Sequence, residues 1–161
     1  MASTAHSMGD REIVFTRDFD APRALVFQAW TDIRHVGHWW GPKGFTTTTH
    51  EMDVRPGGVW RFIMHGPDGV DYPNRITYEE VVAPERLVYA HTGDGESDDA
   101  RFRVTVTFAE SRTTRGPQTR IVMRMLFETA AERDRVVTQY GAIEGANQTL
   151  DRLAQHLARM A

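Results

Sequence analysis

Two segments in which every second residue is apolar constrain the fold of this chain most strongly. The first is residues 101–109, where apolar side chains alternate with Arg and Thr, and residues 119–128 repeat the pattern. Each segment predicts a strand with one covered and one solvent-exposed face, as is common in antiparallel sheets. The covered faces need a layer of structure packed against them.

The C-terminal part of the chain is predicted to supply this layer. Thr129 and Glu132 have the spacing of a capping box, which marks the start of a helix. Apolar residues then recur at three- and four-residue steps from Val136 to Leu157, so the pattern predicts one helix over residues 131–159. At 1.5 Å per residue this helix is roughly 43 Å long, enough to cross a sheet.

The preceding residues complete an α+β pattern. Residues 11–20 alternate like a strand, and two short helices are predicted at 21–31 and 32–39. Turns that contain Gly and Pro separate the remaining predicted strands, which are 45–54, 58–65, 73–83, 86–92, 101–109 and 119–128.

Length and composition limit the organisation of the protein. The 161 residues fit one domain, which we place at residues 11–161 after a disordered N-terminal extension at 1–10. The absence of cysteine excludes disulfide scaffolds and cysteine nucleophiles. The net charge of −3 gives no general attraction to nucleic acid. No apolar run is long enough for a membrane span or a signal peptide, and we take the cytoplasm as the default location.

Four segments carry a resemblance to a known family. They are GHWWGPKGF (37–45), MDVRPGGVWRFIMHGPDGVDY (52–72), EEVVAPERLVY (79–89) and EGANQTLDRLAQHL (144–157). In this order they resemble the activator of heat-shock protein 90 ATPase homologue-like branch of the SRPBCC superfamily, which also contains the START and birch-allergen proteins. The resemblance implies a helix-grip fold. This fold has a curved seven-stranded antiparallel sheet, two short helices and a long C-terminal helix that encloses a cavity.

The chain departs from this family in its last helix. Where many relatives carry tryptophan after a Glu-Gly pair, this chain has Ala146. If that position faces the cavity, the pocket is correspondingly larger. Gly141 and Gly145 lie nearby, although glycine inside a helix costs up to about 1 kcal/mol relative to alanine. We expect these two glycines to permit close packing between helix and sheet.

Aromatic and methionine side chains are predicted to line the interior. The candidates for ligand binding are Trp39, Trp40, Trp60, Phe62, Met64, Tyr78, Tyr89, Met123, Met125 and Tyr140. Any one of them alone is best explained as an ordinary core residue. Together they suit a cavity for an apolar ligand, because such pockets are mostly hydrophobic with a few placed polar groups.

Three polar residues on apolar faces are the other candidates for ligand binding. Glu80 shares the parity of Tyr78, so a regular strand would turn its carboxylate inward, whereas a bulge would turn it outward. His91 has the parity of Tyr89, and Asn147 lies within the apolar stripe of the last helix. Each of the three could be satisfied inside the protein or could form a hydrogen bond with a ligand.

These residues leave three functions open. We favour a protein that binds an apolar, aromatic or lipid-like small molecule, without a cofactor. The alternative is an enzyme of the cyclase, dehydratase or hydrolase type, with Glu80, His91 and Tyr78 as its acid and base groups. A third function, a co-chaperone-like or stress-response interaction module, follows from the family name alone. The chain lacks the additional N-terminal domain of eukaryotic-type activators, so we expect no chaperone partner.

Other sites and partners have weaker support. His35 and His38 are three residues apart, but no carboxylate–histidine motif accompanies them, so we expect no metal site. Arginines on the solvent face of the late strands could form a basic stripe for an acidic partner or could be ordinary surface residues. No segment specifies a dimer interface, which leaves a homodimer open.

Overall fold

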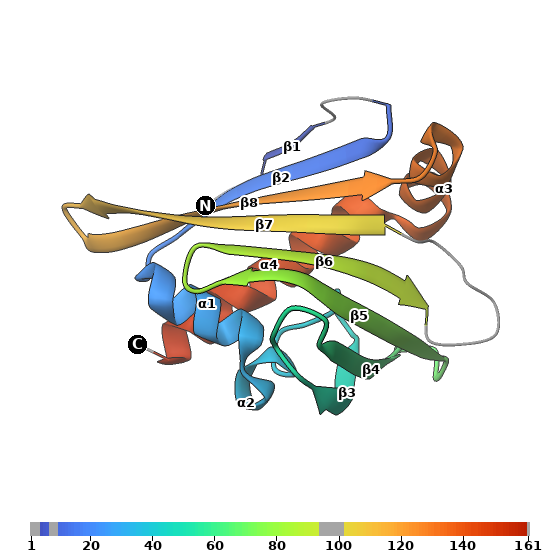
Figure 1. Ribbon diagram of the computed structural model, residues 1–161, viewed down its shortest axis with the longest axis horizontal. Helices are drawn as coiled ribbons and strands as arrows, with labels where there is room; N and C mark the ends of the chain where they lie inside the picture. Colours follow the sequence, from blue (N-terminus) through green and yellow to red (C-terminus); the bar gives the residue numbers. More distant parts are fainter. Residues whose placement is uncertain (1–3, 7–9, 94–101, 161) are drawn as a thin grey trace.

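An antiparallel sheet with a C-terminal helix packed across one face forms the framework (Figure 1). The computed structural model describes residues 4–6, 10–93 and 102–160. The strands are β1 (Thr4–His6), β2 (Glu12–Phe19), β3 (Thr46–Met52), β4 (Val59–His65), β5 (Asp71–Val82), β6 (Arg86–Gly93), β7 (Phe102–Thr113) and β8 (Gly116–Phe127). The helices are α1 (Arg23–Thr31), α2 (Ile33–Val36), α3 (Ala130–Tyr140) and α4 (Ala142–Met160).

The strands lie in the order β1-β2-β8-β7-β6-β5-β4-β3, and all neighbours are antiparallel. From β3 to β8 each strand pairs with the next one along the chain, whereas β2 pairs with β8. The predicted fold class is confirmed: a seven-stranded antiparallel sheet, short helices and a long C-terminal helix. The three-residue strand β1 extends this sheet at the β2 edge.

The expected disorder of residues 1–10 does not hold for Thr4–His6. Thr4 pairs with Thr16, and His6 pairs with Val14. An edge strand presents a row of unpaired N–H and C=O groups, which an extended neighbouring segment can satisfy whatever its side chains are. This pairing depends on the backbone, so the small polar side chains of the segment do not signal it. Residues 1–3 and 7–9 lie outside the described residues.

The single helix predicted over residues 131–159 is divided at Gly141. Its start is right, because the Thr129 hydroxyl accepts a hydrogen bond from the Glu132 N–H at 3.0 Å. Gly141 has φ +59° and ψ +42°, the left-handed conformation, and its N–H donates to the Val136 carbonyl. This is the usual way in which a glycine ends a helix. The long helix α4 begins after it.

The two glycines are expected to respond to alanine with opposite signs. Gly141→Ala should lower the free energy of unfolding by about 1 kcal/mol, because a Cβ is unfavourable in the left-handed conformation. Gly145→Ala should raise it by up to about 1 kcal/mol, because Gly145 is helical and the new Cβ would lie 3.8 Å from Pro42, an ordinary contact. Urea denaturation measures both changes, and a stabilised Gly141→Ala variant would contradict the observed helix break.

Close packing explains neither glycine, contrary to the expectation from the sequence. A Cβ on Gly141 would meet no atom within 4 Å, and a Cβ on Gly145 fits without displacing its neighbours. The conformation of the backbone at Gly141 is the reason for a glycine there.

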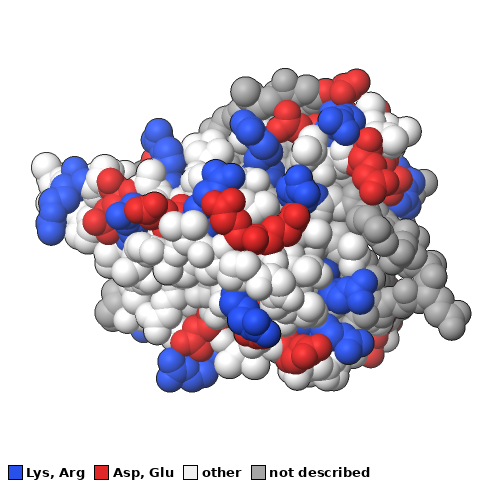
Figure 2. Space-filling view, viewed as in Figure 1, with Lys and Arg blue, Asp and Glu red and all other residues white. Residues whose placement is uncertain are grey.

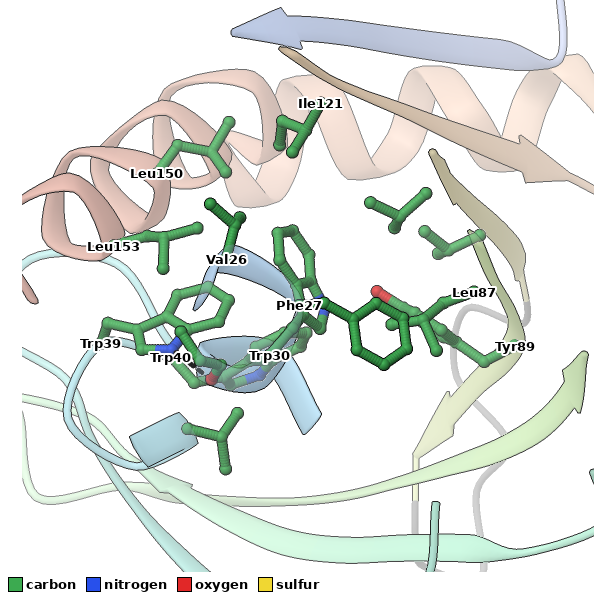
Figure 3. Packing of buried hydrophobic residues seen from close by; sticks show 14 of the residues in the cluster. Val26, Phe27, Trp30, Trp39, Trp40, Leu87, Tyr89, Ile121, Leu150 and Leu153 are labelled. Atoms are coloured by element: carbon green, nitrogen blue, oxygen red, sulfur yellow. Dashed lines mark hydrogen bonds between the residues drawn. The ribbon is translucent and has the colours of Figure 1, made fainter. Parts of the chain in front are cut away.

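The core lies between the sheet, α1 and α4, and the segment after α2 contributes two tryptophans to it. The Trp39 indole N–H donates to the Ala29 carbonyl at 3.0 Å, and its ring packs edge-on against Trp30 with a centroid distance of 5.0 Å. Figure 3 shows Trp30, Trp39 and Trp40 gathered together, with Leu153 as the labelled residue of α4 nearest to Trp39. These contacts fasten the segment 37–45 to α1.

Acidic and basic side chains alternate on the solvent face of the sheet (Figure 2). Three ion pairs connect strands there. Arg120–Asp18 at 2.7 Å and Arg124–Glu12 at 3.0 Å join the neighbouring strands β8 and β2, and Arg103–Glu79 at 2.8 Å joins β7 to β5 across β6. The described arginines of the expected basic stripe are therefore matched by carboxylates. Arg101 lies outside the described residues.

Candidate ligand-binding cavity

An apolar cavity of about 310 Å³ lies between the sheet and the first half of α4. The strands β4, β6, β7 and β8 form one wall, and α1, the segment 39–42 and α4 form the other. No Asp, Glu, Lys or Arg side chain is present among the described residues that line it. A buried charge would lack a compensating partner there, so this lining suits an uncharged molecule.

Many side chains that the sequence nominates for ligand binding do line this cavity. They are Trp39, Trp40, Met64, Tyr89, His91, Met123 and Met125. Methionine is flexible and adapts to irregular shapes, so the presence of Met123 and Met125 at alternate positions of β8, on the same face, suits a binding wall. Ala146 also lines the cavity, so the condition under which its small side chain leaves a larger pocket is met.

Three other nominated aromatics are buried core residues outside the cavity lining. Trp60 and Phe62 are each 1% exposed and stack with a centroid distance of 4.1 Å, and Trp60 packs edge-on against Trp40 at 4.7 Å. Tyr78 packs edge-on against Tyr89 at 6.2 Å, and burial raises its pKa. These residues pack against residues of the cavity wall: Trp60 and Phe62 contact Trp40, and Tyr78 contacts Tyr89.

The prediction that Glu80 points inward is wrong. The pairing of β5 with β6 shifts between Tyr78 and Glu80, so one extra residue reverses the parity of the strand. The Glu80 side chain is exposed, and it forms an ion pair with Arg86 at 3.1 Å. The combination of Glu80, His91 and Tyr78 as acid and base groups is therefore not assembled.

Asn147 and Tyr140 do not contribute to the described lining. Asn147 lies on α4 next to Ala146 but is not among the lining residues, and its buried Oδ1 has no hydrogen-bond partner among the described residues. The side chain of Tyr140 lies outside the described part of the structure.

Several lining residues were not nominated from the sequence. They are Trp30, Pro42, Phe102, Val104, Thr149 and Leu150. The alternation in β7 and the apolar stripe of α4 did identify Phe102, Val104 and Leu150 as residues on covered faces. A covered face becomes core or cavity wall according to what packs opposite it, and periodicity does not carry that information.

His91 is the histidine among the described residues that line the cavity. Its Nε2 lies 3.0 Å from Asn74 Oδ1, and its ring lies against Phe102 with a centroid distance of 4.9 Å. Burial lowers the pKa of His91 from 6.5 to about 4. The imidazole is therefore neutral at physiological pH.

Acid is expected to destabilise the protein through His91. Between pH 6.5 and about 4 the unfolded chain binds a proton at this residue that the folded protein does not bind. The free energy of unfolding should therefore be highest above pH 6.5 and should fall as the pH drops toward 4. In a His91→Gln variant this fall should be smaller, as measured by urea denaturation at neutral pH and at about pH 4.5. An equal fall in both proteins would refute the assignment.

Arg152 of α4 holds the segment that closes one side of the cavity. Its Nη1 lies 2.8 Å from the Gly41 carbonyl oxygen, 3.0 Å from that of Phe45 and 3.3 Å from that of Pro42. The Pro42 carbonyl also accepts a hydrogen bond from the Phe45 N–H at 3.0 Å, and the guanidinium of Arg152 joins the backbone of the segment 40–45 to α4.

Replacing Arg152 with methionine is expected to loosen this segment. Arg152→Met keeps most of the side-chain length but leaves partly buried carbonyls unpaired, at a cost of about 1–3 kcal/mol in the free energy of unfolding. Arg159→Met is the matched control, because Arg159 is exposed on the same helix and should change stability by less than about 0.5 kcal/mol. Equal stability of the two variants in urea would contradict the role of Arg152.

The described residues contain neither of two other kinds of site. Nowhere among them do three or more His, Asp or Glu side chains converge in a way that could hold a metal ion. None of the described helices combines the length and apolar character needed to cross a membrane.

The chain matches one family model, described as Activator of Hsp90 ATPase homolog 1-like protein, over residues 20–158. No curated protein matches the chain.

Solved structures of bacterial proteins have the same fold. A protein from Arthrobacter aurescens is 20% identical with a TM-score of 0.86, and the match covers 98% of this chain and 91% of that one. A protein from Rhodobacter sphaeroides is 20% identical with a TM-score of 0.83, over 99% and 100% of the two chains. The AHSA1 protein from Silicibacter pomeroyi is 18% identical with a TM-score of 0.74, over 93% and 99%. At these identities the likeness establishes the fold alone.

Proposed function

Because this chain belongs to the Activator of Hsp90 ATPase homolog 1-like family of the SRPBCC superfamily, whose fold typically binds ligands, we propose that it binds a small apolar or aromatic molecule. The binding site is the cavity between the sheet and α4.

The observation that carries this proposal is the size and character of the cavity. A volume of about 310 Å³ falls at the lower end of the range of roughly 300–1,000 Å³ that is usual for ligand pockets. An apolar cavity of about 150 Å³ is enough to bind benzene, so a cavity of this size suits a molecule of about two rings. The uncharged lining favours a neutral ligand.

The tryptophans of the protein allow a direct test. Trp30, Trp39 and Trp40 line the cavity, whereas Trp60 lies behind its wall. Titration of ¹⁵N-labelled protein with naphthalene should give saturable shifts in the indole N–H signals of the first three, larger than the shift of Trp60. The absence of any saturable shift up to the solubility limit of naphthalene would refute the proposal.

A further inference from the structure

His91 contributes a polar group to the cavity wall, and one of its two ring nitrogens has no hydrogen-bond partner among the described residues. Thr149 also lines the cavity, but its hydroxyl donates to the Gly145 carbonyl at 2.9 Å. The Tyr89 hydroxyl remains protonated, because burial raises the pKa of Tyr89. His91 is two residues farther along β6, so both side chains point to the same face of the sheet.

The orientation of the Asn74 amide determines which nitrogen of His91 carries the proton. Asn74 Nδ2 donates to the Tyr72 carbonyl at 2.8 Å, which leaves Oδ1 facing His91. Oδ1 can only accept a hydrogen bond, and it lies 3.0 Å from His91 Nε2. Nε2 is therefore the protonated nitrogen of the neutral ring.

The other nitrogen, Nδ1, consequently carries a free lone pair. No side chain or backbone group among the described residues forms a hydrogen bond with it. The rings of Phe102 and Phe62 flank the imidazole, with centroid distances of 4.9 and 6.0 Å, so apolar groups surround this acceptor. An acceptor in such surroundings is stabilised by a donor on a bound molecule.

We propose that the ligand of this cavity carries a hydroxyl or N–H group that donates a hydrogen bond to His91 Nδ1. The proposal rests on the proposed function, because it names the polar feature of a ligand bound at the same site. The ligand class is thus a neutral, largely apolar molecule of about two rings with one hydrogen-bond donor.

Three probes of similar shape test the proposal: naphthalene, 2-naphthol and 2-methoxynaphthalene. The naphthol can donate a hydrogen bond, the methyl ether can only accept one, and naphthalene can do neither. The wild-type protein should bind 2-naphthol about tenfold more tightly than the methyl ether, a ratio typical of one neutral hydrogen bond. The affinities are measured by titration calorimetry at neutral pH.

Two variants assign the preference to a residue. His91→Phe keeps a ring but removes the acceptor, so 2-naphthol and the methyl ether should bind about equally, while naphthalene binding shows that the cavity is intact. His50→Phe is the matched control, because it makes the same replacement at an exposed residue of β3 outside the cavity lining and should keep the preference for 2-naphthol.

Asn74→Asp provides an independent test that leaves His91 in place. A carboxylate next to Nε2 favours the doubly protonated ring, in which Nδ1 becomes a donor. The preference should then shift from 2-naphthol toward the methyl ether. This variant decides the question even if His91→Phe does not fold.

The outcomes separate the two proposals. If none of the three probes binds, the proposed function fails. If all three bind the wild-type protein with equal affinity, the cavity binds apolar molecules but the role of His91 is overturned. A preference for 2-naphthol that survives in both His91→Phe and Asn74→Asp would also overturn it.

Discussion

Ala146→Trp is expected to abolish naphthalene binding while the protein remains folded. Ala146 lines the cavity from α4, so the indole of the variant would project into the space that a ligand needs. A tryptophan side chain is about the size of a two-ring ligand, and it would fill much of the volume of about 310 Å³. We expect the affinity for naphthalene to fall by about 100-fold or more, which corresponds to nearly 3 kcal/mol of binding free energy.

A separate variant, with tryptophan introduced elsewhere on the same helix, is the control for Ala146→Trp. Ala158 is exposed near the end of α4, far along the helix from the cavity, so Ala158→Trp should bind naphthalene like the wild-type protein. The indole N–H titration described above measures both variants, and circular dichroism checks that each is folded. Wild-type affinity in Ala146→Trp would mean that the probe binds outside this cavity.

Trp39→Ala is expected to lower the free energy of unfolding by about 3–5 kcal/mol, the usual cost of removing a large buried ring. Trp39 is 0% exposed, and its indole N–H donates to the Ala29 carbonyl at 3.0 Å. Its ring packs edge-on against Trp30 at 5.0 Å and Trp40 at 5.3 Å. Its removal would leave an internal space at the junction of α1, α4 and the segment 37–45.

One further variant separates the loss of the hydrogen bond from the loss of the ring, and a second variant at an exposed residue is the control. Trp39→Phe keeps an aromatic ring but leaves the Ala29 carbonyl unpaired, so its cost should be smaller, about 1–3 kcal/mol. Ile33→Ala removes a side chain that is 54% exposed, and it should change stability by no more than about 0.5 kcal/mol. Urea denaturation measures all three. A loss below about 1 kcal/mol in Trp39→Ala would show that this tryptophan does not anchor the segment.

Periodicity predicted the architecture well because it reports which face of an element is covered. The alternation in residues 101–109 and 119–128 corresponds to β7 and β8, which pair along their whole length. The apolar stripe of the C-terminal segment corresponds to α4, with Leu150 and Leu153 buried. Burial of these faces is imposed by the side chains themselves, so the sequence carries it.

Local backbone irregularities escaped the sequence patterns because packing decides them. The bulge that turns Glu80 outward adds one residue to β5 relative to β6, and the extra residue is recognised only when the two strands are aligned. The left-handed Gly141 divides a segment whose apolar spacing is continuous. A glycine is compatible with either a helix interior or a helix end, so composition alone does not distinguish the two.

The sequence by itself determined the fold class, the covered faces and the aromatic character of the interior. Only the tertiary structure separated Trp39, Tyr89 and His91, which line the cavity, from Trp60 and the other buried aromatics that form the core behind it. The physical reason is that a cavity is a difference between the space that the backbone encloses and the volume of all the side chains facing it. Whether one side chain borders the cavity or fills the core depends on residues distant in the chain that pack against it. Neither the type of that side chain nor its spacing in the sequence encodes those contacts.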